Sequence, residues 1–250
     1  MQLAVELPIS LLEMNSNFDY DFIIANHYRD FTDYRKFYQQ KQNRVSLLDN
    51  GAFEFGTSID GEEYSKIIAE LNPTIILLPD VYRNRDDTLK LSFDFLYKMT
   101  KGTQNLPQGF MGVLQGITEQ DFLQCFMRYV SSPEITHIGI PYHAFYRPKF
   151  LRDYSINDIC TQFEKKIHIL GLQNPFEICE LKEFSCIESI DTSLPVASGL
   201  RELSFRKLKW CGMKGDMNSV ATAKQKDIIA DNIDFLKSLC SKQQYPQNSH

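Results

Sequence analysis

Short, almost purely apolar runs recur along the chain, at residues 22–25, 45–48, 74–78, 110–114, 136–140, 167–170 and, more weakly, 187–190. Strands that are apolar on both faces are typical of parallel sheets covered by helices, whereas half-exposed antiparallel strands alternate between apolar and polar residues. The runs therefore predict the buried strands of a parallel sheet.

Segments with the period of an α-helix lie between these runs, and two of them begin with a start signal. Asp60 and Thr118 each stand three residues before an acidic residue, as the first residue of a capping box does, and apolar residues then recur at helical spacing. Strand followed by helix, repeated along the chain, is the signature of an α/β fold.

The spacing of the runs favours a closed barrel. Successive strand ends lie roughly 20 to 35 residues apart, which is the length of one strand–helix unit. With residues 207–211 as a weaker last strand the count reaches eight, and 250 residues is the usual size of a (β/α)8 barrel. We predict one TIM-barrel domain over residues 1–241 and a disordered polar tail at 242–250. An open doubly wound sheet is the alternative, but no G-x-G-x-x-G motif follows an early strand.

Composition excludes some classes of protein. A hydrophobic content of 43% and a net charge of −5 exclude a disordered chain and argue against coating of nucleic acid through bulk charge. No apolar run approaches the ~18 residues of a membrane span, and no signal-peptide pattern opens the chain, so we expect a cytoplasmic protein. The six cysteines form no C-x-x-C pair, so we predict neither a zinc module nor a disulfide framework, and no cofactor.

Polar residues and glycines stand where the apolar runs stop. The carboxyl ends of all strands of a barrel converge on the face that carries the active site, so we expect three carboxylates and a carboxamide around one pocket. Glycines there let a ligand approach the backbone. Each aspartate alone is explained equally well as a helix cap or turn residue, and only the alignment of the set favours a site. The set is Asp49, Asp80, Gln115, Gly116, Gly139, Gly171 and Asp191.

The motifs around these residues resemble those of the tRNA-guanine transglycosylase superfamily. They are D-N-G-A-F at 49–53, P-D-V at 79–81, L-Q-G at 114–116, I-G-I-P-Y at 138–142, H-I-L-G-L at 168–172 and D-T-S-L-P at 191–195. Lacking the family's cysteine zinc cluster, the sequence is most similar to the compact DNA-guanine transglycosylases of bacteriophages (the DpdA type). The resemblance covers roughly residues 45–200. It implies an enzyme that exchanges guanine in DNA for a free 7-deazaguanine base of the preQ0 or preQ1 type, a base related to queuosine.

The resemblance also implies a role for each residue. Asp191 matches the nucleophile that attacks C1′ and holds the sugar as a covalent intermediate, and Asp49 matches the general acid/base. Asp80 matches the acceptor of the N1–H and amine of a guanine-type base, Gln115 the donor to its O6, and Gly139 the backbone group beside it. The residue types suit this chemistry, because one carboxylate traps an oxocarbenium-like centre while a second moves a proton.

The sequence departs from the family pattern near Asp49 and Gln115. Ala52 and Glu54 stand where the family has glycine and glutamine, and Ile117 replaces the second glycine after Gln115. Together with the missing zinc cluster, these departures weaken the case for an RNA substrate more than the case for this class of reaction. The same base exchange on tRNA remains the alternative.

A basic stretch after Asp191 is the predicted contact to the nucleic-acid backbone, since phosphates are held mainly by lysine and arginine. A solvated basic face explains it equally well. The stretch consists of Arg201, Arg206, Lys207, Lys209 and Lys214. Four more basic residues could extend it, namely Arg83, Arg85, Arg147 and Lys149. Aromatic residues that could stack on an extruded base are Tyr142, His143, Phe145 and Tyr146.

Two further classes of function stay open. One is a non-catalytic barrel that holds a free deazapurine or a nucleic acid. The other is an aldolase or isomerase of small phosphorylated sugars, which is disfavoured because no glycine-rich phosphate loop follows the last strands.

Overall fold

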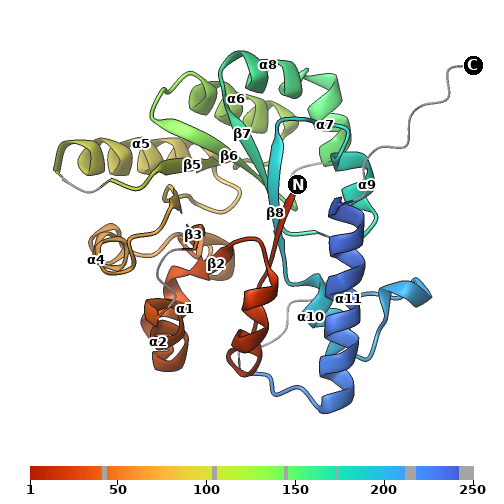
Figure 1. Cartoon of the computed structure of the whole chain (residues 1–250). Coiled ribbons are helices and arrows are strands. Elements are labelled where there is room, and N and C mark those ends of the chain that lie inside the picture. The colour runs from red at the N-terminus through yellow and green to blue at the C-terminus, as the bar shows by residue number, and fades with distance from the viewer. Residues whose placement is uncertain (41–43, 103–105, 144–145, 173, 212–217, 242–250) are drawn as a thin grey trace, which may run out of the picture.

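The computed structural model describes residues 1–40, 44–102, 106–143, 146–172, 174–211 and 218–241. Eight parallel strands form one sheet in the order β1-β8-β7-β6-β5-β4-β3-β2, and helices surround them (Figure 1). The sheet is rolled into a nearly closed barrel, so the prediction of a single (β/α)8 fold is confirmed. The predicted tail at 242–250 lies outside the described residues.

The elements alternate along the chain as the sequence predicts. The strands are β1 (Gln2–Val5), β2 (Asp21–Ile24), β3 (Ser46–Asp49), β4 (Ile75–Leu77), β5 (Gly109–Val113), β6 (Ile135–Pro141), β7 (Lys166–Leu170) and β8 (Ile187–Thr192). The α-helices are α1 (Ala25–Asp30), α2 (Thr32–Gln40), α3 (Ala52–Phe55), α4 (Gly61–Leu71), α5 (Arg85–Gly102), α6 (Glu119–Val130), α7 (Arg147–Asp153), α8 (Ile156–Gln162), α9 (Glu177–Leu181), α10 (Leu194–Gly199) and α11 (Ala223–Ser241). Two 3-10 helices are η1 (Ile9–Asn17) and η2 (Phe205–Lys207).

One strand differs from the prediction. The expected last strand at 207–211 is wrong, because Phe205–Lys207 form the 3-10 turn η2 and residues 208–211 form no strand. The eighth strand is instead β1, which pairs in parallel with β8 so that Ala4 lies opposite Asp191. Only three consecutive apolar residues mark β1 in the sequence, and no helix-period segment precedes them.

The edge strands β1 and β2 form no ladder with each other within the described residues, and Asp19, two positions before β2, links the two edges. The Asp19 carboxylate accepts a hydrogen bond from the Leu3 backbone N–H at 2.8 Å. The Asp19 backbone N–H donates to the Leu3 carbonyl oxygen at 3.1 Å. These two bonds join the N-terminal strand to the segment that enters β2.

Alternate side chains along each strand point into the barrel or out to the helices, which produces two hydrophobic cores. The larger core lies between the strands and the surrounding helices. The smaller core fills the interior with Ala4, Tyr20, Phe22, Ile24, Leu47, Leu77, Met111 and Val113. The interior is therefore packed rather than hollow, and a ligand can enter only above this layer.

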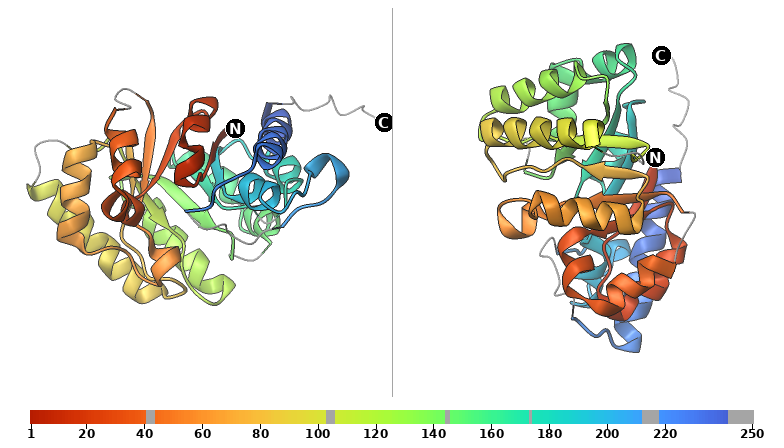
Figure 2. Two further views of the ribbon diagram at one scale, coloured as in Figure 1. Left: turned by 90° about the horizontal axis from the view of Figure 1, so that it is seen from below. Right: turned by 90° about the vertical axis from the view of Figure 1, so that its left-hand side faces the viewer.

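The predicted helix starts are confirmed for α4 and α6. The Asp60 carboxylate accepts from the backbone N–H groups of Glu62 and Glu63, and Thr118 forms a complete capping box with Asp121. The C-terminal helix α11 packs beside α10, α9 and β1, outside the barrel (Figure 2). Within the described residues, none of the helices has the length and hydrophobicity needed to span a bilayer.

Candidate active site

A cavity of about 470 Å³ lies above the interior core, at the carboxyl ends of the strands. It is lined by five of the seven residues predicted for catalysis and base binding, from five different strand ends. These are Asp49, Asp80, Gln115, Gly171 and Asp191. The strand ends therefore bring together residues that are up to 142 positions apart (191 minus 49) in the sequence.

Asp191 lies in β8 and is almost fully buried. Its Oδ1 atom is 3.0 Å from Nε2 of His168, which points inward from the neighbouring strand β7. The Gly171 backbone N–H, at the end of β7, donates to the same oxygen at 3.4 Å. Both described hydrogen bonds thus reach Oδ1, and a carboxylate held in this way has a fixed orientation at the cavity wall.

Asp80 follows β4 and is held by two side-chain amides. Asn50 Nδ2 donates to its Oδ1 at 2.7 Å, and Gln115 Nε2 donates to its Oδ2 at 2.6 Å. Both amide groups are themselves fixed, because Asn50 also donates to the Leu78 carbonyl and Gln115 Oε1 accepts from the Arg83 backbone N–H. Asp80 and Gln115 therefore form one rigid hydrogen-bonding edge.

Asp49 ends β3 and is half-buried. Its Oδ1 accepts from the Gly51 N–H at 2.6 Å, which closes a tight turn at the cavity wall. Gly51 has a φ of 76°, and a Cβ at that position would lie 1.9 Å from the side-chain oxygen of Asn26. Only glycine fits this turn, which explains the D-N-G sequence.

The gap between Asp49 and Asp80 is bridged from the helix layer. Tyr64 of α4 is fully buried, and its hydroxyl lies 2.9 Å from the carbonyl oxygens of both Leu48 and Leu77. Burial raises the pKa of Tyr64 well above its ordinary value, and the nearby charges of Asp49 and Asp80 raise it further. The phenol therefore stays protonated and binds the ends of β3 and β4 together.

The predicted glycines have different surroundings. Gly171 lines the cavity, whereas Gly116 and Gly139 are not among its described lining residues. A Cβ on Gly116 would lie 2.2 Å from Cβ of Asp121, and one on Gly139 would lie within 3.4 Å of Leu170, Met111 and Val113 inside the barrel. These two positions require glycine for close packing, and their role in base binding stays a prediction.

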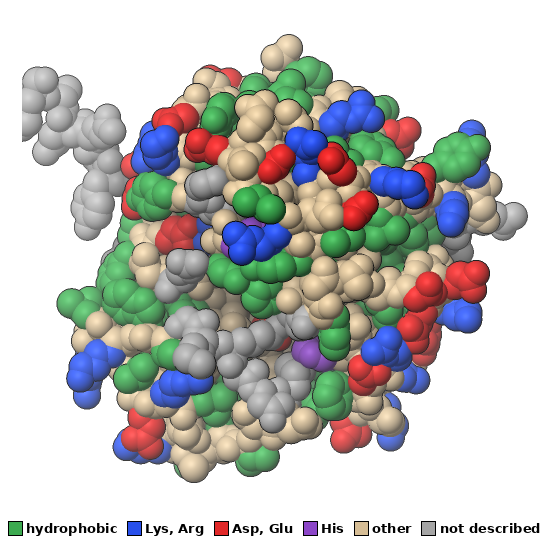
Figure 3. Space-filling view, turned by 180° about the vertical axis from the view of Figure 1, so that it is seen from behind, with side chains coloured by type: hydrophobic (Ala, Val, Ile, Leu, Met, Phe, Trp, Pro, Cys, Tyr) green, Lys and Arg blue, Asp and Glu red, His purple; other side chains and the backbone are tan. Residues whose placement is uncertain are grey.

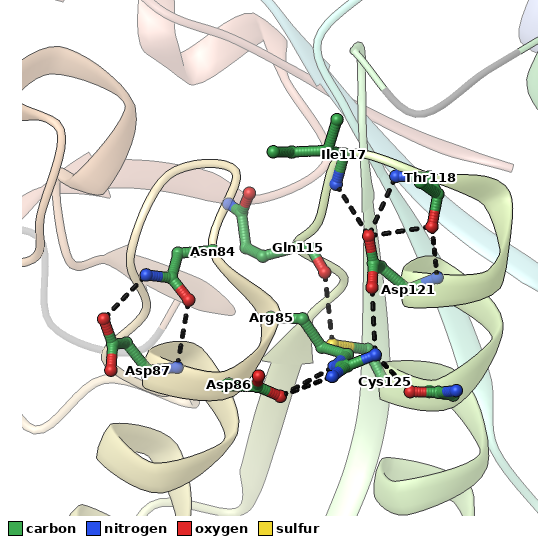
Figure 4. Close-up of polar contacts among 10 residues, drawn as sticks. Asn84, Arg85, Asp86, Asp87, Gln115, Ile117, Thr118, Asp121 and Cys125 are labelled. Atoms are coloured by element: carbon green, nitrogen blue, oxygen red, sulfur yellow. Dashed lines mark hydrogen bonds and ion pairs between the residues drawn. The ribbon is translucent and has the colours of Figure 1, made fainter.

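Asp121 organises the loop that carries Gln115 and Gly116 (Figure 4). Its Oδ2 accepts from the backbone N–H groups of Ile117 and Thr118 at 3.2 and 2.9 Å, and its Oδ1 accepts from Arg85 at 2.9 Å. The hydrogen bonds from the backbone and side chain of Thr118 and from the Ile117 backbone, followed by the charge of Arg85, lower the pKa of Asp121. The Gln115 amide points away from this cluster, toward Asp80.

Aromatic side chains form one side of the cavity. Phe53 and Tyr142 both line it, with ring centroids 5.2 Å apart, and Tyr82 and His143 lie beside them. Burial, followed by the charges of Arg83 and Arg147, lowers the pKa of His143 to about 4, so its ring is neutral at physiological pH. Two of the predicted stacking residues, Tyr142 and His143, are therefore at the cavity, while Phe145 lies outside the described residues.

The basic stretch after Asp191 is exposed but does not line the cavity within the described residues. Arg206 pairs with Asp231 of α11 at 2.7 Å, and Glu202 pairs with Lys224. Figure 1 shows this segment, in light blue, on the far side of α11 from the strands. Lys207, Lys209 and Arg201 remain exposed candidates, and Lys214 lies outside the described residues.

Arg147 does not extend a phosphate contact as predicted. It is buried, and its guanidinium donates to both carboxylate oxygens of Glu177 and to the carbonyl oxygens of Leu170 and Gly171. It therefore supports the end of β7 and the Gly171 turn. Arg85 and Lys149 are likewise paired with nearby aspartates.

Charges of both signs are mixed on the surface. The face shown in Figure 3 carries lysine and arginine side chains interspersed with aspartate and glutamate rather than a continuous basic area. Any contact with a nucleic acid backbone on this face would rely on single basic residues.

The sequence missed Glu6, which lines the cavity from the end of β1. Its backbone N–H donates to the Thr192 carbonyl at 3.1 Å, so it lies next to the strand of Asp191. The available signal is its position directly after Leu3, Ala4 and Val5, a run too short to predict a strand by itself. Glu6 is a fourth carboxylate at the cavity.

The described lining of the cavity is acidic. It includes Glu6, Asp49, Asp80 and Asp191 and neither lysine nor arginine. Such a lining favours ligands that present hydrogen-bond donors or develop positive charge. Among the described residues, no group of three or more His, Cys, Asp and Glu side chains is placed to hold a metal ion.

Comparison with known proteins supports the fold. No protein-family model matches the sequence, and no curated protein matches it. The structure is similar to N-(5'-phosphoribosyl)anthranilate isomerase from Pyrococcus furiosus, with a TM-score of 0.50, 10% sequence identity and coverage of 95% of this chain and 99% of that chain. It is also similar to D-psicose 3-epimerase in the presence of D-fructose, with a TM-score of 0.52, 10% identity and coverage of 97% and 100%. Likeness at this identity shows the TIM-barrel fold alone.

Proposed function

We propose that this protein is a glycosyltransferase that exchanges guanine in DNA for a free 7-deazaguanine base, through a covalent bond between Asp191 and C1′ of the nucleotide. The observation that carries the proposal is that Asp49, Asp80, Gln115 and Asp191 line one cavity. Its volume of about 470 Å³ suits a small-molecule site that holds a base and its sugar.

The reaction consists of two displacements at C1′. In the first, a carboxylate oxygen of Asp191 forms a bond to C1′, the bond from C1′ to the base nitrogen breaks, and Asp49 as an acid gives its proton to the leaving base. In the second, Asp49 as a base removes the proton from the entering nitrogen, which bonds to C1′ and releases the Asp191 carboxylate. Two displacements retain the original configuration at C1′.

Asp80 and Gln115 suit the recognition of the base. The N1–H and amine of a guanine-type base form a donor edge that a carboxylate satisfies, and the second N–H of the Gln115 amide can donate to the base carbonyl. The aromatic side of the cavity, with Phe53 and Tyr142, offers surfaces for stacking. A base paired inside a duplex cannot enter such a cavity, so we propose that the nucleotide is extruded from the strand.

An acidic cavity disfavours the sugar-phosphate alternative. Phosphates are held by lysine, arginine or a helix N-terminus, and the described lining offers only the third, at Ser193 before the six-residue helix α10. An oxocarbenium-like centre, in contrast, is stabilised by nearby carboxylates.

The proposal is tested by incubating the protein with labelled guanine and either DNA or unmodified tRNA, and counting the label retained in the polymer. We expect incorporation into DNA with the wild-type protein and none with Asp191→Asn. Asp60→Asn is the matched control, because Asp60 is an exposed helix cap that asparagine replaces well. Incorporation into tRNA alone would contradict the DNA substrate, and guanine binding without incorporation into either polymer would contradict the transferase.

Base recognition has its own test. Hypoxanthine lacks the exocyclic amine of guanine, so wild-type protein should bind guanine more tightly than hypoxanthine in calorimetry. Asp80→Asn should weaken guanine binding by about 100-fold and remove that preference, because a hydrogen bond to a charged acceptor is lost. An unchanged preference in Asp80→Asn would show that another group reads the amine.

A further inference from the structure

A fully buried histidine lies directly behind the carboxylate proposed as the nucleophile. His168 of β7 has no exposed surface, and both of its ring nitrogens have partners. Nε2 is 3.0 Å from Oδ1 of Asp191, and Nδ1 is 2.8 Å from the Ser189 hydroxyl. The Ser189 and Asp191 side chains come from the same strand, two residues apart, so the imidazole bridges them from β7.

In a neutral ring, the two partners favour one tautomer. An ionised carboxylate can only accept a hydrogen bond, so Nε2–H donates to Asp191. Nδ1 of a neutral ring then has a lone pair, and the Ser189 hydroxyl donates to it. In this tautomer Ser189 donates to His168, and His168 donates to Asp191.

The other neighbours of the ring are aromatic. Phe22 stacks on it with an interplanar angle of 12° and a centroid distance of 6.4 Å, and the edge of Tyr20 lies at 6.2 Å. The Tyr20 hydroxyl donates to the Ile190 carbonyl at 2.7 Å. The environment thus fixes the plane of the imidazole and leaves Asp191 and Ser189 as its polar partners.

We propose that His168 is a positioning residue for Asp191. By holding Oδ1 from behind, it fixes the orientation of the buried carboxylate and leaves Oδ2 as the oxygen that bonds to C1′. Ser189 supports this role by fixing the tautomer of the ring. The proposal rests on the proposed function, in which Asp191 is the nucleophile.

A histidine that only fills the core is the competing explanation, and three variants separate the two. His168→Gln keeps an N–H donor near the position of Nε2, whereas His168→Phe keeps a ring and removes both nitrogens. Ser189→Ala removes the hydroxyl donor and leaves the ring in place. His137→Phe is the matched control, because His137 is a buried histidine of the adjacent strand β6 that pairs with Glu188 away from the cavity.

Two measurements on the exchange reaction are made after the fold of each variant has been checked by thermal unfolding. They are the rate of covalent adduct formation with a guanine-containing DNA strand and the affinity for free guanine. We expect His168→Phe to slow adduct formation by about 100-fold, His168→Gln and Ser189→Ala by about tenfold or less, and His137→Phe hardly at all. Guanine affinity should stay within about twofold in all four, since Asp80 and Gln115 are untouched. Equal rates in His168→Phe and His137→Phe would overturn the proposal.

Two spectroscopic measurements need no activity. Nitrogen NMR of histidine-labelled wild-type protein should show His168 as a neutral ring with the proton on Nε2, and the other tautomer would overturn the proposal. Carbon NMR of aspartate-labelled protein, assigned with Asp191→Asn, should show the carboxyl signal of Asp191 displaced in His168→Phe, because the contact of Oδ1 with Nε2 is lost. An unchanged Asp191 carboxyl signal would also overturn the proposal.

The experiments distinguish the failure of this inference from that of the proposed function. Wild-type protein that exchanges no base on either polymer contradicts the proposed function, and the two NMR results then decide whether His168 positions Asp191. Wild-type protein that exchanges bases while His168→Phe matches it contradicts the positioning role alone. If His168→Phe does not fold, the rate of adduct formation in Ser189→Ala and the tautomer of His168 in the wild-type protein decide whether His168 positions Asp191.

Discussion

The two ends of the barrel use carboxylates in different ways. At the amino ends of the strands, Glu188 binds His137 and Lys166, and Asp21 binds Arg44 at 3.0 Å. At the carboxyl ends, Asp80 accepts from the amides of Asn50 and Gln115, and Asp191 accepts from His168 and a backbone N–H. Each acid of the first kind is paired with a lysine or an arginine, whereas the described partners of the second kind are amides, a histidine and a backbone N–H.

This difference separates stability from function. A carboxylate matched with basic groups contributes to the folded state, and its charge is already balanced. A carboxylate held by amides or a neutral ring has a negative charge that no cation balances, so it can interact with a ligand. Burying such a charge lowers the stability of the folded state. The amino end of the barrel is therefore expected to govern stability and the carboxyl end activity.

The largest expected effect is that of Asp191→Asn on activity. The rate of base exchange should fall by on the order of 10⁴-fold or more, because an amide cannot form the covalent intermediate. The melting temperature should hardly change, since the amide oxygen can still accept from His168 and Gly171. Both are measured on one preparation, by label incorporation and thermal unfolding. If Asp191→Asn lost much of its stability but still exchanged bases, the carboxyl end would govern stability rather than activity, contrary to the expectation.

Gly116→Ala should show that a residue at the carboxyl end can also be structural. The new Cβ would lie 2.2 Å from Cβ of Asp121, so the loop has to move and take Gln115 with it. We expect a loss of about 2 to 4 kcal/mol in the free energy of unfolding, measured by urea denaturation, and weaker guanine binding. Gly102→Ala is the control, because no atom lies within 4 Å of its added Cβ. Equal stability of the two variants would show that the loop has room.

Glu188→Gln should affect stability and leave the exchange rate unchanged. The hydrogen bond from His137, with help from Lys166, lowers the pKa of Glu188 from its ordinary 4.5 to about 2. The folded state binds this proton less readily than the unfolded chain, so the contribution is complete above about pH 4.5 and is lost as the pH falls toward 2.

The wild-type protein should therefore be more stable than Glu188→Gln by about 1 kcal/mol at pH 7, a modest value because the Glu188 side chain is 28% exposed. Urea unfolding at a series of pH values should show the difference shrinking below pH 4.5. A difference that does not depend on pH would mean that packing, rather than charge, makes Glu188 stabilising.

Glu6→Gln is expected to have the smallest effect. It replaces one of the four carboxyl groups at the cavity and leaves the shape almost unchanged, so kcat/KM should fall by about tenfold or less, as one unit charge across a solvated cavity contributes on the order of 1 kcal/mol. The control is Glu13→Gln, an exposed glutamate of η1 outside the cavity. A loss as large as that of Asp191→Asn would give Glu6 a direct part in the chemistry.

The sequence predicted the fold and most of the candidate site for a physical reason. Parallel strands covered by helices must be apolar on both faces, so a polar residue directly after such a run marks the carboxyl end of a strand. Asp49, Asp80, Gln115 and Asp191 were found in this way, and the barrel brings them to one cavity.

The sequence could not reveal features that depend on pairing between distant segments. The short run Leu3, Ala4, Val5 becomes a strand only because β8 lies beside it, and Glu6 was missed with it. The contact of His168 with Ser189 follows a register shift after Ile167, and no local pattern encodes such a shift. The exposed basic stretch is easy to find in the sequence, but its ion-pair partners are not. Arg206, for example, pairs with Asp231 of α11, which no local pattern predicts.

The Tyr64 hydroxyl braces the binding site from outside it. It lies within hydrogen-bond distance of the carbonyl oxygens of Leu48 and Leu77, one residue before Asp49 and three before Asp80. We expect Tyr64→Phe, which removes only this hydroxyl, to loosen the hold on both acids without changing a residue of the described cavity wall.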